Sequence, residues 1–240
     1  MPGLGTIINA VGIIVGGIIG LLAGKRIGVR LQNMLSAVMG ISVIFIGAAG
    51  VFQHMLVVTD DGISTQGSMM MIFSLVLGGI LGSLIKIEDG CERFGEWLKR
   101  KTGNGSDAKF VEGFVTASLT VCIGAMAIMG SIADGISGDY SILTTKAILD
   151  LVIIVVMTAS MGIGCIFSAI PVVILQGSVT LLSRLLVPVM TDMAISNLSL
   201  VGSVLIFCVG INLTFGKKIA VGDLLPSVLF AVIFAFVPLI

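Results

Sequence analysis

Long apolar runs fill most of the chain, and short polar segments separate them. A helix needs about 20 predominantly apolar residues to cross the hydrocarbon core of a bilayer. The pattern therefore predicts an all-α, polytopic bundle of about eight membrane-spanning helices, forming a single transmembrane domain over residues 1–240. The expected spans are 4–23, 35–57, 69–86, 113–133, 147–169, 171–190, 198–215 and 225–240.

The boundary between the fifth and sixth runs is the least defined part of this pattern. The two runs meet at Ile170 and Pro171 with almost no polar residue between them. They predict either a tight hairpin of two spans or one long broken segment. Pro171, close behind Gly164, favours a break that frees backbone carbonyl groups at membrane depth.

The longest polar stretch, 87–109, has a different pattern. Phe94, Trp97 and Leu98 are spaced for one helix face, and charged residues surround them. This predicts a short amphipathic helix on the cytoplasmic membrane surface, ended by the turn-forming sequence GNGSD. The alternative use of this helix is as a docking site for another protein.

Basic residues gather in alternate loops. They are Lys25, Arg26 and Arg30 after the first run, Lys86, Arg93, Lys99, Arg100, Lys101 and Lys109 after the third, and Lys217 and Lys218 after the seventh. The other loops carry mainly Asp60 and Asp61, Asp134 and Asp139 with Lys146, and Asp192. Because loops rich in Lys and Arg stay in the cytoplasm, both termini are expected outside.

Composition agrees with a membrane protein. The chain is 57% hydrophobic and 11% charged, with a mean hydropathy of +1.19. Soluble domains carry about 25% charged residues, so these charges are too few to cover a water-facing surface. The formal net charge of zero gives no basis for nucleic-acid binding. The main expected partner is the lipid bilayer.

Small residues recur at every fourth position in three runs. They are Gly12, Gly16, Gly20 and Gly24, then Ser74, Gly78 and Gly82, then Ser160, Gly164 and Ser168. Such stripes let two helix backbones approach closely in lipid. The alternative is that they line a narrow path or let helices slide.

An internal repeat accompanies these stripes. The sequence GGIIGLLAGKRIG from Gly16 resembles GGILGSLIKIEDG from Gly78, and GKKIAV at Gly216 resembles GKRIGV at Gly24. A repeating unit of one helical hairpin, present four times, would give eight spans. Successive units would then have the same orientation in the membrane, as in parallel-repeat transporters.

The segment between the fourth and fifth runs is the strongest candidate site. It carries Asp134, Asp139, Lys146 and Asp150, whose carboxylates could gather a cation or a proton near the outer mouth. Lys146 and Asp150 are four residues apart and can pair on one helix face. The order of importance expected is Asp150, then Asp134, then Asp139. The alternative is a solvated outer loop.

Four further polar residues fall inside predicted spans. Arg184 either extends to the outer interface or faces a polar cavity together with Gln176. Asn9, Asn212 and Gln176 bond either neighbouring helices or a substrate.

Motifs for catalysis and metal binding are missing from the sequence. Cys91, Cys122, Cys165 and Cys208 have no metal-ligand spacing, and His54 is the only histidine. Neither HExxH nor GxSxG occurs. We therefore expect neither an enzyme nor a metal site, and no cofactor.

Several motifs together resemble the bacterial membrane family of domain-of-unknown-function 554. They are TIINAVGIIVGGIIG, CIGAMAIMGSIADGISGD, KAILD, ILQGSVTLL and GINLTFGKKIAVGDLLP. The resemblance covers essentially the whole chain. It implies a location in the inner membrane, but no substrate, cofactor or catalytic residue.

One position departs from the family pattern. A proline often follows the glycine of the fourth helix in that family, whereas this chain has Ala125 after Gly124. If that proline bends the helix in relatives, the bend is expected to be absent here.

These observations favour a transporter or channel for a small solute or ion, with a homo-oligomer as one possible form. The alternative is a membrane scaffold or assembly factor that moves nothing. A polar path near the membrane midplane would favour transport, and a dry, closed bundle would favour the scaffold.

The charge pattern predicts the orientation, which cysteine labelling can test. A membrane-impermeant thiol reagent added outside should modify a cysteine placed at Gly62 and miss one placed at Gly103. The reverse labelling pattern would overturn the assignment of both termini to the outside.

Overall fold

The computed structural model describes residues 2–59, 62–105 and 107–237. Its longer helices are α1 (Leu4–Gly24), α2 (Val29–Met55), α3 (Ser68–Ile85), α4 (Ile87–Lys101), α5 (Phe110–Cys122), α6 (Ala125–Ser137), α7 (Ser141–Met161), α8 (Ala169–Leu181) and α10 (Asp192–Phe215). The shorter elements are β1 (Leu56–Thr59), β2 (Gly62–Thr65), η1 (Ile163–Ser168), α9 (Ser183–Leu186), η2 (Gly222–Leu224), α11 (Ser227–Ile233) and η3 (Phe234–Phe236).

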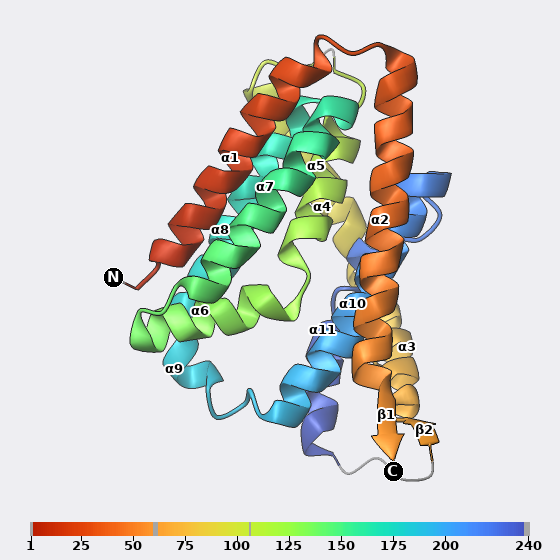
Figure 1. Ribbon diagram of the computed structural model, residues 1–240, viewed down its shortest axis with the longest axis vertical. Helices are drawn as coiled ribbons and strands as arrows, with labels where there is room; N and C mark the ends of the chain where they lie inside the picture. The colour runs from red at the N-terminus through yellow and green to blue at the C-terminus, as the bar shows by residue number, and fades with distance from the viewer. Residues whose placement is uncertain (1, 60–61, 106, 238–240) are drawn as a thin grey trace.

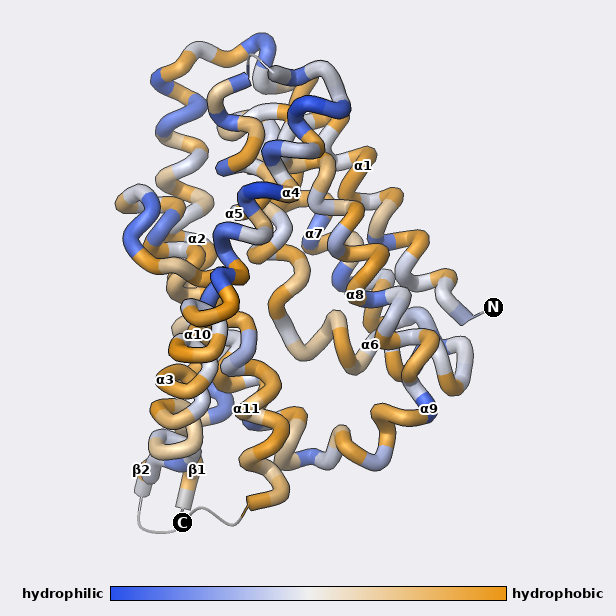
Figure 2. Tube along the Cα trace, turned by 180° about the vertical axis from the view of Figure 1, so that it is seen from behind, coloured by the Kyte–Doolittle hydropathy of each residue, from blue (hydrophilic) through white to orange (hydrophobic). Residues whose placement is uncertain are grey.

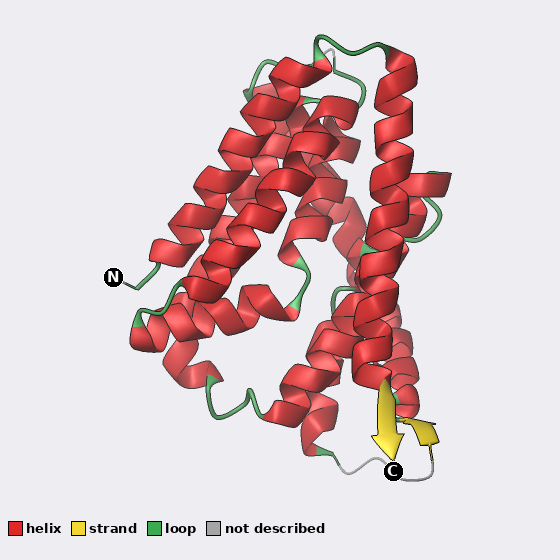
Figure 3. Ribbon diagram, in the orientation of Figure 1, coloured by secondary structure: helices red, strands yellow, loops and turns green. Residues whose placement is uncertain are grey.

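The molecule is an elongated helical bundle with two distinct ends (Figures 1 and 3). We call the lower half in Figure 1 the N-terminal end, where the β1–β2 hairpin lies at the bottom and the N-terminus and the 138–140 turn lie higher on the left side. The upper end holds the 25–28 turn and residues 102–105, and we call it the basic end. The two strands pair antiparallel, with Leu56 opposite Thr65, so the second apolar run finishes as a hairpin rather than as helix.

The number of spans differs from the predicted eight. Among the described residues, six helical segments are long and apolar enough to cross a membrane, or seven when α5 and α6 count as one bent span. At the C-terminus, the apolar helical stretch Gly222–Phe234 is shorter than a full span. The eighth predicted span is therefore not confirmed, and its last residues, 238–240, lie outside the described part. The four-hairpin repeat also stays a prediction.

Large apolar side chains cover the outside of the bundle. Phe45 is 70% exposed and Leu84 is 77% exposed, and many similar residues accompany them. Figure 2 shows hydrophobic positions along α1, α3 and α10, whereas hydrophilic positions gather around α4. An apolar surface this extensive is stable only against lipid, so the chain is a membrane protein.

The glycine stripe of α1 packs directly on the backbone of α7, as the sequence predicts. A Cβ atom built on Gly16 would lie 2.6 Å from the Leu151 carbonyl oxygen, and one on Gly20 would lie 2.3 Å from that of Val155. The contacts advance by four residues on both helices, which therefore run parallel. The matching pairs are Gly12–Ala147, Gly16–Leu151, Gly20–Val155 and Gly24–Ala159.

Two other contacts also place a glycine directly against the backbone of a neighbouring segment. In α2, a Cβ atom on Gly47 would lie 2.5 Å from the Phe207 nitrogen of α10. In α3, one on Gly82 would lie 1.8 Å from the Asp223 carbonyl oxygen. Because no side chain separates these backbones, van der Waals contact fixes the helix pairs closely.

The fifth and sixth apolar runs form two spans, Ser141–Met161 and Ile163–Leu181. The chain turns between them at Gly162, which has a φ of 92°. Pro171 does not break a helix, because it lies in the first turn of α8, where a missing N–H costs nothing. The break between the two spans was predicted at Ile170–Pro171, and this is wrong, because the break lies about two helical turns earlier in the chain.

The fourth predicted span bends despite the missing proline. Helices α5 and α6 meet at 62°. Gly124 lies at the bend with φ 144° and ψ 149°, a conformation that residues with a side chain rarely adopt. The expectation of an unbent helix at Ala125 is thus wrong, because the glycine alone allows the bend.

The amphipathic segment forms helix α4, as predicted. Leu98 is buried beside Phe110 and Phe114 of α5, and the Phe94 ring lies 5.7 Å from that of Phe114. These contacts hold the apolar face of α4 against α5. The place of α4 at the membrane surface stays a prediction.

The glycine contacts predict that Gly20→Ala lowers the stability in detergent. The added methyl group would overlap the Val155 carbonyl, and overpacking costs about 1–3 kcal/mol. Gly177→Ala in α8 is the matched control, because its Cβ atom would meet no atom within 4 Å. Thermal unfolding measures both variants. Equal melting of Gly20→Ala and the wild type would show that this contact is not formed.

Candidate functional site

A buried ion pair lies inside the bundle on α7. The Lys146 Nζ atom lies 2.8 Å from Asp150 Oδ1 and 2.7 Å from Asp150 Oδ2. The side chains are 9% and 4% exposed, respectively. The predicted pairing of these residues is confirmed. Helix packing covers both side chains, so they do not belong to a solvated loop, and their position relative to the membrane stays a prediction.

Asp134 near the end of α6 is also buried, with no measurable exposure. Its Oδ2 atom accepts hydrogen bonds from the backbone N–H groups of Gly3, at 3.1 Å, and Gly5, at 3.0 Å. Helix N-terminal N–H groups lack partners within the helix and favour a negative charge, so Asp134 stabilises the start of α1. The alternative of a solvated loop therefore fails for Asp134.

Asp139 behaves as a solvated turn residue. It lies in the exposed α6–α7 turn, and its Oδ1 atom accepts a hydrogen bond from the Ser141 N–H at 3.0 Å. Interactions with the Ser141 side chain and this backbone N–H lower the pKa of Asp139. Its expected third rank among the carboxylates agrees with this position.

Several buried polar side chains on α1, α6 and α8 have atoms without a hydrogen-bond partner. These atoms are Thr6 Oγ1, both polar atoms of the Asn9 and Gln176 amides, Asp134 Oδ1 and Thr180 Oγ1. We call these five residues the polar cluster. Leaving a buried polar group unpaired costs about 1–3 kcal/mol, so several such groups together indicate a place built for a polar ligand or water.

Helix geometry places the members of the polar cluster on facing surfaces. Thr6 and Asn9 are three residues apart on α1, and Gln176 and Thr180 are four residues apart on α8, so each pair shares one helix face. Helix α8 contacts both α1 and α6, and α6 carries Asp134. Three helices therefore contribute to one polar region.

A pocket of about 340 Å³ opens at the N-terminal end of the bundle, and Thr6 and Thr180 of the polar cluster line it. Its lining residues are Pro2, Gly3, Thr6, Gly135, Gly177, Thr180, Leu181, Ser183 and Arg184. Arg184 lies on the short helix α9, beyond the end of α8, rather than well inside a span. It is exposed at the pocket mouth, and Gln176 is not among the lining residues, so the structure does not confirm a polar cavity that Arg184 shares with Gln176.

Polar groups continue inward from this pocket. Thr6 and Thr180 line it, whereas Asn9 and Gln176 lie about one turn deeper on their helices. The Asn9 side chain interacts with the Asp150 carboxylate but has no hydrogen bond of good geometry. Beyond this level, the packing is apolar and includes the fully buried Ile13, Ile154 and Val172.

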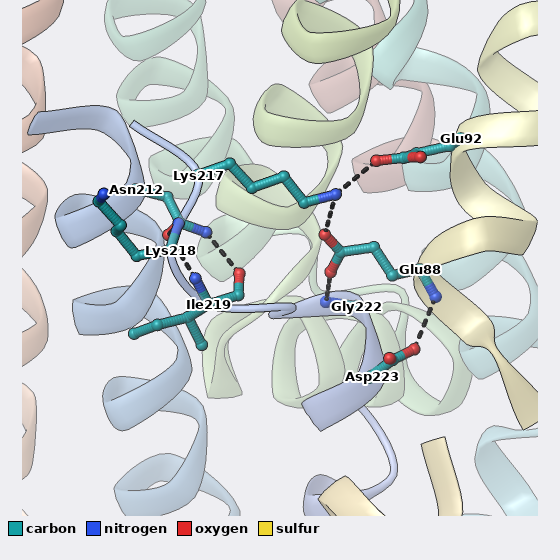
Figure 4. A network of polar contacts seen from close by, with 8 residues as sticks. All are labelled: Glu88, Glu92, Asn212, Lys217, Lys218, Ile219, Gly222 and Asp223. Carbon is teal, nitrogen blue, oxygen red and sulfur yellow. Dashed lines mark hydrogen bonds and ion pairs between the residues drawn. The ribbon is translucent and has the colours of Figure 1, made fainter. Parts of the chain in front are cut away.

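A second polar network joins the start of α4 to residues that follow α10 (Figure 4). Glu88 of α4 pairs with Lys217 at 2.6 Å, and its other carboxylate oxygen accepts a hydrogen bond from the Gly222 N–H at 2.8 Å. Asp223 Oδ1 accepts a hydrogen bond from the Glu88 N–H at 2.9 Å, and Lys217 also pairs with Glu92. The network joins α4 to the loop that follows α10.

The charge of Lys217 depends on these carboxylates. Partial burial lowers the pKa of Lys217, but hydrogen bonds and charge attraction from Glu88 and Glu92 outweigh burial and hold the pKa above its ordinary value. The lysine is therefore protonated at physiological pH. It is exposed in part to solvent, so the pair with Glu92 adds little stability.

Asn212 belongs to this second region and not to the polar cluster. Its Nδ2 atom donates to the Ile219 carbonyl at 2.7 Å, and its Oδ1 atom accepts from the N–H groups of Lys218, at 2.8 Å, and Ile219, at 3.0 Å. All these bonds are local. Asn212 therefore holds the 216–219 loop, whereas the sequence predicted a bond to a neighbouring helix or to a substrate.

A pocket of about 250 Å³ lies beside this network at the basic end. Its lining includes Glu88, Glu92, Lys109, Glu112, Met161, Val209, Asn212 and Lys217. The sequence did not identify Glu88, Glu92 and Asp223 as site residues. Glu88 and Glu92 lie on α4, whose charges are typical of a solvated helix surface, and Asp223 lies in η2, far from them in the sequence. The residues that contact each other in this network are separated by 125 to 135 positions in the sequence.

The described residues contain no group of three or more His, Cys, Asp or Glu side chains that could bind a metal ion. The polar cluster contains a single carboxylate, and its other side-chain oxygen atoms belong to Thr, Asn and Gln.

Two relatives resemble this chain over nearly their whole lengths. The uncharacterized membrane protein YdfK of Bacillus subtilis (strain 168) is 31% identical over 233 residues, which cover 97% of this chain and 96% of the relative. The uncharacterized protein YqgA of Escherichia coli (strain K12) is 25% identical over 232 residues, which cover 95% and 94%. No solved structure matches the chain.

The family comparison agrees with the motifs noted above. Residues 4–236 match the family described as "Protein of unknown function (DUF554)". The match extends from the start of α1 to η3, so it includes both polar regions. The chain belongs to the DUF554 family of membrane proteins.

Proposed function

We propose that this protein transports a small solute or ion across the bacterial inner membrane. The main support is the buried polar cluster, of which Thr6 and Thr180 line a pocket at the N-terminal end and Asn9 interacts with Asp150 of the ion pair. A second charged pocket lies at the basic end. Transporters commonly place their binding groups near the bilayer midplane, in polar regions that helices enclose.

The apolar core provides the barrier that such a transporter needs. Ile13, Ile154 and Val172 lie beyond the polar cluster, whereas Met161 and Val209 line the pocket at the basic end. All five belong to one continuous apolar core. A solute that enters from the N-terminal end would stop at this core until the helices rearrange.

The bend between α5 and α6 offers a place for that rearrangement. Gly124 allows the chain to bend at membrane depth, and α6 carries Asp134. Discontinuous helices of this type recur at transporter binding sites. A change of angle at Gly124 would move Asp134 relative to α1 and α8.

The Lys146–Asp150 pair has a specific role in this proposal. The pair is itself neutral when no solute is bound, because each of its two charges would be costly alone inside a membrane. A bound solute with a positive or polar group would share the Asp150 carboxylate with Lys146 and Asn9.

A membrane scaffold is the second candidate, and helix α4 favours it. Phe94 and Trp97 stack at 5.6 Å and are 39% and 48% exposed, so α4 presents an aromatic surface. This role would leave the polar cluster without a solute to bind. Transport and scaffolding therefore differ in whether the interior charges affect flux.

The proposal predicts that Asp150→Asn abolishes flux in proteoliposomes, whereas the exposed control Asp139→Asn retains it. Uptake of radiolabelled sodium and rubidium, together with internal pH from a trapped dye, measures the flux. Full flux in Asp150→Asn would remove this residue from the transport site. Wild-type protein that moves none of these ions would favour the scaffold.

Loss of stability has to be separated from loss of transport. Asp150→Asn leaves Lys146 buried without a counter-charge, which typically costs about 3–5 kcal/mol. The double variant Lys146→Met with Asp150→Leu removes both charges, and we expect it to melt near the wild-type temperature without transporting. Wild-type flux in that variant would show that the pair serves structure alone.

A further inference from the structure

We infer that the polar cluster is a binding site for a monovalent metal cation, centred on Asp134 and the unpaired oxygen atoms around it. This inference rests on the proposed function and names the class of solute or coupling ion. It goes further than the carboxylates alone, because it assigns ligand roles to Thr6, Gln176 and Thr180.

The buried charges of this region do not balance. In the described parts of α1, α6, α7 and α8, the buried ionisable side chains are Asp134, Asp150 and Lys146. Two carboxylates and one ammonium group sum to −1. Lys146 contacts both oxygen atoms of Asp150, so Asp134 is left with backbone N–H groups as its partners and has no ion pair.

The remaining Asp134 oxygen is available to a cation. Its Oδ2 atom is held by the start of α1, while Oδ1 is fully buried and has no partner. A single positive charge at Oδ1 would neutralise the region. An uncompensated buried carboxylate is costly in a membrane, so this position favours a bound cation.

The neighbouring side chains supply the oxygen atoms that such an ion needs. Thr6 and Thr180 each present an unpaired hydroxyl, and Asn9 and Gln176 each present an unpaired carbonyl oxygen. All four residues are at most 6% exposed. Hard cations prefer oxygen ligands of these kinds, and such ligands replace the water that the ion loses on entry.

The charge balance favours a monovalent ion over a divalent one. A divalent cation would leave the region with a net charge of +1 and would contact a single free carboxylate. Calcium sites usually have several carboxylates and six to eight oxygen ligands. An anion is excluded by the absence of an unpaired buried cation among the described residues of these helices, since Arg184 lies at the exposed mouth.

The pocket at the N-terminal end borders the site, because Thr6 and Thr180 line it, whereas Asn9 and Gln176 do not. Both hydroxyl groups are buried, so entry needs a small opening movement, after which an ion would meet Thr6 and Thr180 before Asn9 and Gln176. We expect the ion to exchange its water for these oxygen atoms stepwise. The site would then exchange ions with the solution at the N-terminal end only.

Thermal unfolding of the detergent-solubilised wild type tests this inference. Sodium, lithium and potassium chloride are each compared with choline chloride at equal ionic strength and fixed pH. At a concentration well above the dissociation constant, at least one metal ion should raise the Tm by roughly 2–4 °C. Asp134→Asn should lose this rise, whereas Asp139→Asn should keep it.

A second variant guards against misfolding of Asp134→Asn. Thr180→Val keeps the shape of the side chain and removes one ligand oxygen, so it should need about tenfold more metal ion for the same rise in Tm. A wild-type Tm that is equal in every salt, or that changes with pH alone, would overturn the inference. An unchanged rise in both Asp134→Asn and Thr180→Val would also overturn it.

Tm and flux together distinguish failure of the cation site from failure of the transport proposal. Cation-specific stabilisation without any flux would keep the site and reject transport. Flux that is unaffected by every metal ion, together with an unchanged Tm, would keep transport and reject the cation site.

Discussion

The contact between the α1 glycines and the α7 backbone determines where the buried polar groups lie. Gly16 and Gly20 pack on carbonyl groups of α7, so the two parallel helices keep one register along their length. That register places Asn9 beside Asp150. It also brings the start of α1 to Asp134, beside the pocket at the N-terminal end of the bundle. A side chain at these glycines would separate the helices, and the polar cluster would lose its enclosure.

Much of this arrangement follows from residue patterns. Apolar run length predicts most of the spans, and the four-residue glycine spacing predicts the close contact of α1. The i, i+4 spacing predicts the Lys146–Asp150 pair, because both side chains lie on one face of α7. Candidate residues for the polar region are also predictable, since Asn9 and Gln176 are unusual inside apolar helices. Each of these features depends on residues close together in the chain.

Features that depend on distant contacts are harder to predict. In the sequence, Glu88 does not differ from the other charged residues of an amphipathic helix. Its role depends on the 216–223 loop, which packs against it in the folded protein. Thr6 and Thr180 are ordinary in apolar helices, and their importance appears only when α1 meets α8. The bend at Gly124 was missed for another reason. A glycine without a proline permits a bend but does not require one, so packing of α6 against α8 decides the outcome.

The central claim is that solutes from the N-terminal end reach the interior between α1, α6 and α8. Substituted-cysteine accessibility in a background without native cysteines measures this directly. The account predicts that a water-soluble, membrane-impermeant thiol reagent modifies Gln176→Cys, although Gln176 is 1% exposed. It also predicts no modification of Ile174→Cys, which is 64% exposed but faces lipid on the same helix. An unreactive Gln176→Cys in folded protein would mean that the interior is dry, and it would contradict the account.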